Sequence, residues 1–222
     1  MNTLIETFLR HQDQIWQSFW DTNFMMGIAM LITLLVGLLL GILLYAFKAE
    51  FLSKNLFCYQ VLSIALNALR SVPFIIFIFI LIPLTRKIFG TSFGNLPATL
   101  PLSLVGISLF SRFVEQALLA VPQTIIDRGR SMGASKLQLI IYFLLPSIVS
   151  DAILSFTSVV ISILSYSTVM GVIGAGGLGE YAFRYGYQEY DYPLMYVILI
   201  LFVAYVFVLQ SLGYILARIF KG

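Results

Sequence analysis

The chain has 222 residues, of which 60% are hydrophobic and only 10% are charged, with a formal net charge of +3. Soluble domains carry roughly 25% charged residues, so this composition excludes a soluble globular protein. The basic residues are scattered, which gives nucleic-acid binding no support, and the single cysteine, Cys58, excludes an internal disulfide framework. Long uncharged apolar runs, each able to cross a hydrocarbon core of about 30 Å, predict an all-α polytopic membrane protein.

Residues 1–21 place apolar side chains at roughly helical spacing among charged ones, and no secretory signal pattern is present. We interpret this segment as an amphipathic helix at the outer membrane interface, with Trp16 and Trp20 at headgroup depth. An extension of the first span is the alternative. The first span is predicted at about residues 22–47, where Gly37 and Gly41 form a GxxxG pair. This pair favours close packing against a neighbouring helix of the same subunit over a dimer contact.

Residues 55–85 are apolar except for Arg70, and Pro73 follows three residues later. A charged side chain inside a membrane is costly and normally faces protein or water. Arg70 and Pro73 are therefore candidates for the translocation path. Alternatively, residues 55–70 lie along the cytoplasmic boundary and the crossing begins near Pro73, because a helix break is expected there. We favour the second interpretation, which places the second span at about residues 72–88.

The third span is predicted at about residues 96–120, and near its end Arg112 and Glu115 share one helix face. We interpret them as a pair that reaches toward the cytoplasmic interface. Residues 121–146 then interrupt the apolar runs with a polar helix–break–helix, which we call the elbow. Gly133 supplies the break, Ser135 with Gln138 fits a capping box that opens the second helix, and Pro146 is expected to close or kink it.

The fourth span is predicted at about residues 148–173 and contains a stripe of serines on one helical face: Ser155, Ser158, Ser162 and Ser165. Small hydroxyls in a membrane helix allow close helix packing or line a wet path. Packing alone is the simpler interpretation. Four serines in a row nevertheless keep them among the candidate residues of a translocation path.

Gly174, Gly176 and Gly179 follow the fourth span and spell GxGxxG, the pattern of dinucleotide-binding loops. That fingerprint requires a preceding strand and a βαβ unit, so we reject it here and interpret the glycines as a tight loop. Residues 180–192 contain five tyrosines, which indicates an interfacial belt or, alternatively, a docking surface. The fifth span is predicted at about residues 193–217, and residues 218–222 form a short tail.

Basic residues decide the predicted orientation because cytoplasmic loops carry an excess of lysine and arginine. Placing the 48–54 loop, residues 112–151 and the tail inside gathers eight basic residues there against four outside, with Arg70 left unassigned. The N-terminus then lies outside and the C-terminus in the cytoplasm. The sequence also lacks a nucleophile–base motif, a metal-ligand motif and a phosphate-binding GxxxxGK[ST] loop. We therefore expect a chain that is not an enzyme and binds no metal or cofactor, and whose energy comes from a partner acting on the elbow.

The elbow resembles the EAA loop of binding-protein-dependent ABC importer permeases. Its glycine, Gly133, and the closing Leu145-Pro146 have the family spacing, whereas Asp127 stands for the glutamate and Arg128 and Gly129 for the alanines. The resemblance to the methionine-importer subgroup extends over nearly the whole chain. The fragments are FWDT (19–22), LRSVPFIIF (69–77), IPLTR (82–86), GTSFG (90–94), VIGAGGLG (172–179) and RYGYQEYD (184–191).

The resemblance implies a homodimer of five-span subunits in the bacterial inner membrane, bounded by lipid. Two ABC ATPase subunits that hold ATP and Mg would cap its cytoplasmic face, and a substrate-binding lipoprotein would dock outside. Residues implied to contact the ATPase are Asp127, Arg128, Gly129, Ser131, Met132, Gly133, Ala134, Ser135, Leu137 and Pro146. Candidates for docking the binding protein are Gly176, Gly177, Tyr185, Gly186 and Tyr187.

Three functions are compatible with the sequence. The first is the permease of an ABC importer for methionine, in its L- and D-forms. The second is the same machine with another amino acid or small organic solute as cargo. The third is a channel or secondary carrier that works without ATP. It predicts internal repeats or unwound midplane helices with charges, and we find no such pattern in the sequence.

Overall fold

The computed structural model describes residues 2–220, and all regular structure within this range is helical. The helices are α1 (Asn2–Arg10), α2 (Gln12–Lys48), α3 (Leu56–Ser71), α4 (Phe74–Phe89), α5 (Asn95–Leu119), α6 (Gln123–Ser131), α7 (Lys136–Gln138), α8 (Leu145–Val172), α9 (Gly177–Tyr181) and α10 (Tyr192–Ile219). Two π-helical segments, η1 (Leu139–Leu144) and η2 (Ala182–Gln188), follow α7 and α9. The all-α fold predicted from composition is confirmed.

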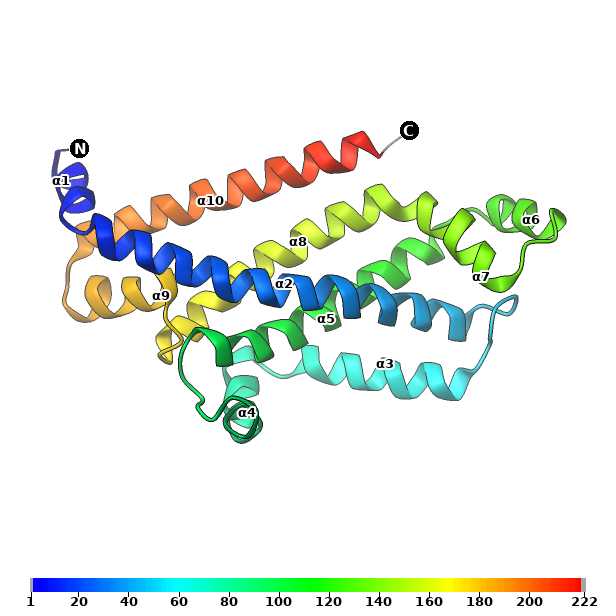
Figure 1. Ribbon diagram of the computed structural model, residues 1–222, viewed down its shortest axis with the longest axis horizontal. Coiled ribbons are helices and arrows are strands. Elements are labelled where there is room, and N and C mark those ends of the chain that lie inside the picture. The colour runs from blue at the N-terminus through cyan, green and yellow to red at the C-terminus, as the bar shows by residue number, and fades with distance from the viewer. Residues whose placement is uncertain (1, 221–222) are drawn as a thin grey trace.

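Long helices run side by side along one axis and form an elongated bundle (Figure 1). Helices α2, α5, α10 and the continuous helix of residues 136–172 are each long and apolar enough to cross a membrane. The pair α3 and α4 makes a fifth crossing if it is counted as one bent span. Four of the five predicted spans fall on these helices. The third and fifth spans differ from them by one or two residues at each end, whereas the helices that contain the first and fourth spans begin ten and twelve residues earlier than predicted.

The predicted boundary at residue 21 is wrong, because α2 begins at Gln12 and continues without interruption through the first span. His11, with a φ of −105° and a ψ of 12°, is the point where the chain leaves α1 and enters α2. A helix of 37 residues is about 55 Å long, so its first turns project beyond a hydrocarbon core of about 30 Å. Only residues 2–10 form a separate amphipathic helix, while residues 12–21 extend the first span.

Helix α5 is the centre of the bundle, and most of its residues are buried. Helix α2 packs closely on it because Gly41 has no side chain. A Cβ atom at Gly41 would lie 2.6 Å from the Cβ of Val114 and 2.7 Å from the carbonyl oxygen of Ser111. Gly37 packs in the same way on the ring of Phe110. The GxxxG pair therefore serves packing within the subunit, as the sequence favoured.

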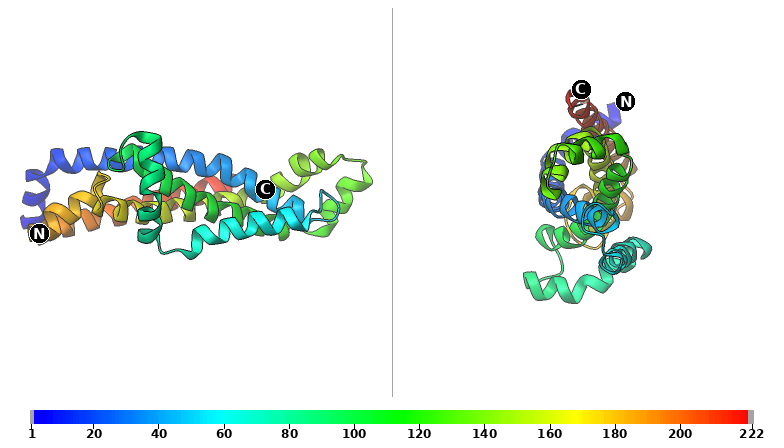
Figure 2. Two further views of the ribbon diagram at one scale, coloured as in Figure 1. Left: turned by 90° about the horizontal axis from the view of Figure 1, so that it is seen from below. Right: turned by 90° about the vertical axis from the view of Figure 1, so that its right-hand side faces the viewer.

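The prediction for residues 55–88 is wrong about which of the two helices, α3 or α4, is aligned with the bundle axis. Helix α3 runs along the bundle axis beside α2 and α5, whereas α4 turns 111° away from it after Pro73 and lies across the bundle (Figures 1 and 2). Residues 55–70 are thus aligned with the spanning helices, and residues 72–88 are not. The physical reason is a set of polar contacts that hold α3 to α5, described below.

The two ends of the bundle carry different structures. Helices α1 and α9 lie at one end, and the elbow, with α6 and α7, lies at the other together with the connection between α2 and α3 (Figures 1 and 2). The C-terminal end of α10 points toward the end that carries the elbow, while the N-terminal helix lies at the opposite end (Figure 1). Each end of the bundle therefore has its own surface of short helices and loops, and the long apolar helices lie between the two ends.

Candidate coupling elbow and translocation path

The first half of the elbow is α6, which ends in a hydrogen-bonded Schellman motif. The amide of Ala134 donates to the carbonyl of Gly129 at 3.1 Å, and the amide of Gly133 donates to that of Arg130 at 3.0 Å. Gly133 has a φ of +75°, a conformation that L-residues with side chains rarely adopt. The break predicted at Gly133 is confirmed, and its bonds make the turn rigid.

The second half begins at Ser135, where the predicted capping box is present. The Gln138 side chain accepts from the Ser135 amide at 2.8 Å, and the Gln138 amide donates to the Ser135 hydroxyl at 3.4 Å. Of the two outcomes expected at Pro146, closing the helix is wrong, because the helix continues through η1 and α8 to Val172. The other expected outcome, a local distortion, fits the π-helical segment Leu139–Leu144 just before the proline. Proline removes one helical N–H and crowds the preceding turn, and the wider π-helical segment just before it accommodates both effects.

The two halves of the elbow are packed directly on each other at Gly129. A Cβ atom there would lie 2.5 Å from Cδ1 of Leu139 and 3.2 Å from the ring of Phe143. Ile126 and Leu139 are buried at this contact. Sequence reasoning treated Gly129 as a departure from the EAA pattern, whereas the structure gives it a packing role that keeps α6 against η1.

The outward surface of the elbow combines apolar and charged side chains. Met132, Leu137 and Tyr142 are 73%, 66% and 69% exposed. Exposed polar residues on the same elbow include Asp127, Arg128, Arg130 and Lys136. Exposed apolar side chains that polar ones surround are typical of a protein interface. Of the predicted coupling residues, Asp127, Arg128, Ser131, Met132, Gly133, Ser135, Leu137 and Pro146 are exposed, Ala134 is half-buried and Gly129 is buried.

A buried ion pair lies between α3 and α5, in the last turns before the elbow. An Arg112 guanidinium nitrogen donates to Glu115 at 2.7 Å, and their side chains are only 11% and 5% exposed. Arg112 also donates to the carbonyl and hydroxyl oxygens of Ser63 and to Asn67, and the Tyr59 hydroxyl donates to Glu115 at 3.0 Å. We call these five residues the α3–α5 clamp.

The clamp corrects the interpretation of Arg112 and Glu115 as a pair at the interface. Tyr59, Ser63 and Asn67 follow one another at intervals of four residues on α3, so they form a polar stripe on one helical face. The sequence therefore contained a signal for this contact that hydropathy alone did not reveal. The clamp ties α3 to the end of α5 that leads into the elbow.

The serine stripe lies on the surface of α8 rather than in the core of the subunit. Ser158 and Ser165 are exposed, and Ser155 and Ser162 are half-buried. Three of the hydroxyls donate to the carbonyl four residues earlier, at 2.9 to 3.2 Å. Ser165 lies beside α10, where it lines a recess together with Leu199 and Phe202. The exposed part of this face is open to a partner or to a wet path.

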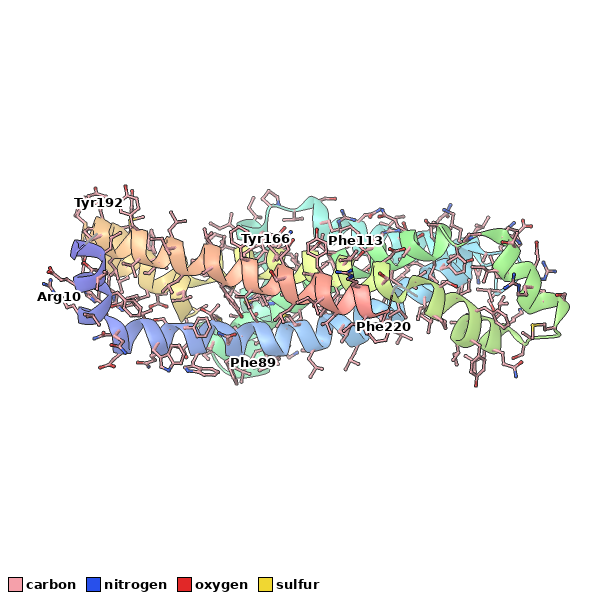
Figure 3. All side chains as sticks on the ribbon, turned by 90° about the horizontal axis from the view of Figure 1, so that it is seen from above. Arg10, Phe89, Phe113, Tyr166, Tyr192 and Phe220 are labelled. Atoms are coloured by element: carbon pink, nitrogen blue, oxygen red, sulfur yellow. The ribbon has the colours of Figure 1, made fainter. Side chains whose placement is uncertain are left out.

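A cavity of about 400 Å³ lies at the break between α3 and α4. Arg70 and Pro73 line it together with residues of α5 and Tyr166 of α8. Tyr166 follows Ser162 by one helical turn on α8, so one wall of the cavity comes from the helix that carries the serine stripe. None of the four serines lines the cavity itself, and Ser165 lines a separate recess against α10. Tyr166 lies about midway along the bundle axis, between the labelled Arg10 and the elbow (Figure 3).

The predicted docking residues lie at the end of the bundle opposite the elbow, but most of them are not at the surface. Gly177 is buried, and a Cβ atom there would lie 2.6 Å from the Thr22 hydroxyl. Gly186 is buried against Met195, Gly176 and Tyr185 are half-buried, and Tyr187 is exposed. The glycines shape this end by letting the loop pack on α2. Exposed side chains there include Arg184, Tyr187, Gln188, Glu189 and Tyr190.

At the same end, His11 and Tyr181 fasten the N-terminal turn to α9. A nitrogen of His11 lies 2.7 Å from the Tyr181 hydroxyl, and the other ring nitrogen lies 3.7 Å from a carboxylate oxygen of Asp191. Burial, with smaller contributions from neighbouring Tyr185, Asp191 and Glu189, raises the pKa of Tyr181 from 10 to about 12. The raised pKa extends the pH range over which the phenol stays neutral and can keep its hydrogen bond to His11.

Comparisons of the sequence with a family model and with individual proteins agree on one family. Residues 37–221 match the family model described as binding-protein-dependent transport system inner membrane component. The chain is 36% identical to the probable D-methionine transport system permease protein MetI of Vibrio cholerae, over 98% of this chain and 96% of that protein. It is 34% identical to the methionine import system permease protein MetP of Bacillus subtilis, over 93% of each chain.

Solved structures agree with this result. The fold matches a chain of the MetNI methionine ABC transporter in an inward-facing conformation with a TM-score of 0.91 and 34% identity, covering 94% of this chain and 96% of that one. It also matches a chain of an amino acid ABC transporter with a TM-score of 0.73 at 18% identity, covering 97% and 96% of the two chains, a likeness of fold alone.

Proposed function

This chain belongs to the family of binding-protein-dependent transport system inner membrane components, and we propose that it is the permease subunit of an ABC importer that carries methionine. The observation that carries the proposal is the similarity to methionine permeases over nearly the full length of both chains, at 34–36% identity. The relatives named for D-methionine and for methionine together support cargo of both enantiomers.

The permease works as a pair of identical subunits whose facing surfaces line the path. Across this interface, the serine stripe on α8 and the break at Pro73 of one subunit face the same two features of the other subunit. Arg70 supports this arrangement, because it is exposed on the single subunit about midway along an apolar bundle. A charge in that position is costly in lipid but tolerable beside a water-filled path.

Two ATPase subunits, which hold ATP and Mg, dock on the elbows at the cytoplasmic face. ATP binding draws the two ATPases together and moves the elbows with them. The Schellman turn, the capping box and the Gly129 contact keep each elbow rigid, so the displacement reaches α5 and α8 instead of being absorbed in the loop. The spans then change from inward-open to outward-open, and hydrolysis returns them.

A substrate-binding lipoprotein delivers methionine at the opposite end, outside the inner membrane. The polar recess there has a volume of about 220 Å³ and is lined by Gln14, Gln17, Asp21, Glu180 and Arg184, among others. In this orientation the N-terminus is outside and the C-terminus is in the cytoplasm. Tyr187 and its exposed neighbours offer amphipathic contacts of the kind that protein interfaces favour.

Reconstitution of the chain in liposomes with its cognate ATPase and binding protein tests the proposal. We expect uptake of labelled methionine that requires ATP and both partners, and that an excess of unlabelled L- or D-methionine suppresses. Suppression by a different amino acid, with methionine ineffective, would assign another cargo to the same machine. Uptake that persists without the ATPase would instead place the chain among channels or secondary carriers.

A further inference from the structure

We infer that the cavity at the Pro73 break is a binding site for a zwitterionic amino acid with an apolar side chain, in which Arg70 holds the α-carboxylate. This inference rests on the proposed function, since it specifies where the cargo pauses inside the permease. The cavity volume of about 400 Å³ falls within the range of ligand pockets. Its wall combines one charge with a few polar groups and an apolar surface, as ligand sites do.

Arg70 is exposed on the single subunit and has no charged partner in the part of the chain that the structure describes. Within residues 2–220 it has no hydrogen bond and no ion pair to another side chain, and the cavity lining contains no acidic residue. Helix α3 has 16 residues, so Arg70 lies roughly 20 Å along the bundle from the start of that helix. An arginine at such a depth needs a partner, and a carboxylate matches its planar pair of donors.

The broken helix adds groups of both signs to the same cavity. No side chain caps the first turn of α4 after Pro73, so its amides remain available to an anion at the positive end of the helix dipole. Helix α3 ends at Ser71 with Val72 in an extended conformation, which leaves carbonyl oxygens of its last turn for an ammonium group. Interrupted helices in transporters bind charged substrate groups through such ends.

The rest of the wall selects the side chain of the ligand. The rings of Phe74 and Tyr166 contact each other with centroids 4.5 Å apart, and Val105 and Leu109 of α5 complete the apolar surface. A flexible thioether packs well against aromatic rings. A ligand with a charged side chain would find no partner of opposite sign on this wall, apart from the arginine that the carboxylate already occupies.

Transport by arginine variants of the complete complex in liposomes gives the first test. Arg70→Gln removes the charge, and we expect methionine uptake at limiting substrate to fall by about tenfold or more, as for the loss of a charge-assisted hydrogen bond. Arg70→Lys keeps the charge without the paired donors and is expected to retain intermediate uptake. Arg86→Gln, the same change at an exposed arginine in the last turn of α4, is the control and should transport like the wild type.

Chemical modification gives a second test, because its result would not change with Arg70 if that residue had only a structural role. Ser71→Cys is introduced in a Cys58→Ala background, and its reaction rates with an anionic and a cationic methanethiosulfonate are compared in the same complex. We expect the anionic reagent to be favoured, this preference to fall by about tenfold in Arg70→Gln, and methionine to slow the modification. Alanine-sized or acidic amino acids should protect less.

The outcomes separate this inference from the proposed function. If wild-type complex fails to import methionine, the proposed function itself is wrong. If the wild type imports methionine but Arg70→Gln matches it, and methionine leaves the modification of Ser71→Cys unchanged, the function stands and the site is refuted. Loss of uptake together with loss of both the charge preference and the protection supports the site.

Discussion

The α3–α5 clamp makes a quantitative prediction about Glu115. Its carboxylate is 5% exposed and accepts from Arg112 and Tyr59. Glu115→Gln preserves the shape of the side chain but leaves the Arg112 charge buried without a counter-charge. Breaking a buried pair in this way costs about 3–5 kcal/mol. For a chain of about this size each kcal/mol lowers the melting temperature by about 2–4 °C, so we expect a decrease of roughly 6–20 °C.

The assay is thermal unfolding of the purified permease in detergent, followed by intrinsic fluorescence. Glu50→Gln is the matched control, because Glu50 pairs with Lys54 at the surface and is 81% exposed. Exposed pairs contribute about 0–1 kcal/mol, so the control should melt within a few degrees of the wild type. The double variant Arg112→Met/Glu115→Leu should be less destabilised than the sum of its single variants. Equal melting temperatures for both glutamine variants, or strict additivity, would refute the clamp.

Three further predictions concern packing, the elbow and the outer end of the bundle. Gly41→Leu should lower stability by about 1–3 kcal/mol or more through overpacking, whereas Gly27→Leu, where no atom lies within 4 Å of a Cβ, should be tolerated; equal melting of the two contradicts the α2–α5 contact. Gly133→Val should uncouple ATP hydrolysis from methionine uptake while the protein stays inserted, and Gly133→Asn, which tolerates a positive φ, should stay coupled; normal coupled uptake in the valine variant refutes the rigid elbow. Because the pKa of Tyr181 is raised from 10 to about 12 in the folded protein, the stability it adds is complete below pH 10 and lost as the pH rises to about 12. Wild type should therefore destabilise more than Tyr181→Phe over that interval in denaturation curves, and parallel curves would contradict the burial of this phenol.

Much of the fold follows from local rules that one sequence contains. Apolar runs of sufficient length predict spans wherever they occur, and four helices match them. The elbow was also predictable, since the Ser135–Gln138 capping box and the Gly133 break depend on residues only a few positions apart. These features need no knowledge of distant parts of the chain.

The direction of α3 could not be predicted in the same way. Pro73 indicates a break but not which of the two flanking helices follows the bundle axis. The decision depends on Arg112, which is 45 residues away from Asn67 in the sequence yet donates a hydrogen bond to it at 3.1 Å. The periodicity of either helix does not predict a long-range pairing of this kind. The polar stripe on α3 does indicate that a polar partner lies against it.

The candidate site shows the same division between local and distant information. The sequence named Arg70, Pro73 and the serine stripe, but it could not show that Tyr166 closes a cavity against the broken helix. It also named Gly177 and Gly186 for docking, although both are buried because α2 and α10 pack on them. Glycine in a loop indicates close packing as readily as exposure, and only the surrounding helices decide between the two.

The central claim is that the elbow transmits the movement of the ATPases to the permease. Thr124 is exposed on α6 of the elbow and is not among the residues implied to contact the ATPase, so it is a suitable position for a spin label after Thr124→Cys in a Cys58→Ala background. The measurement is the distance between the two labels of a dimer in the complete complex in liposomes, without nucleotide and with ATP bound to hydrolysis-deficient ATPases. We predict a single distance that shortens when ATP binds, and an unchanged distance in active complex would contradict the claim.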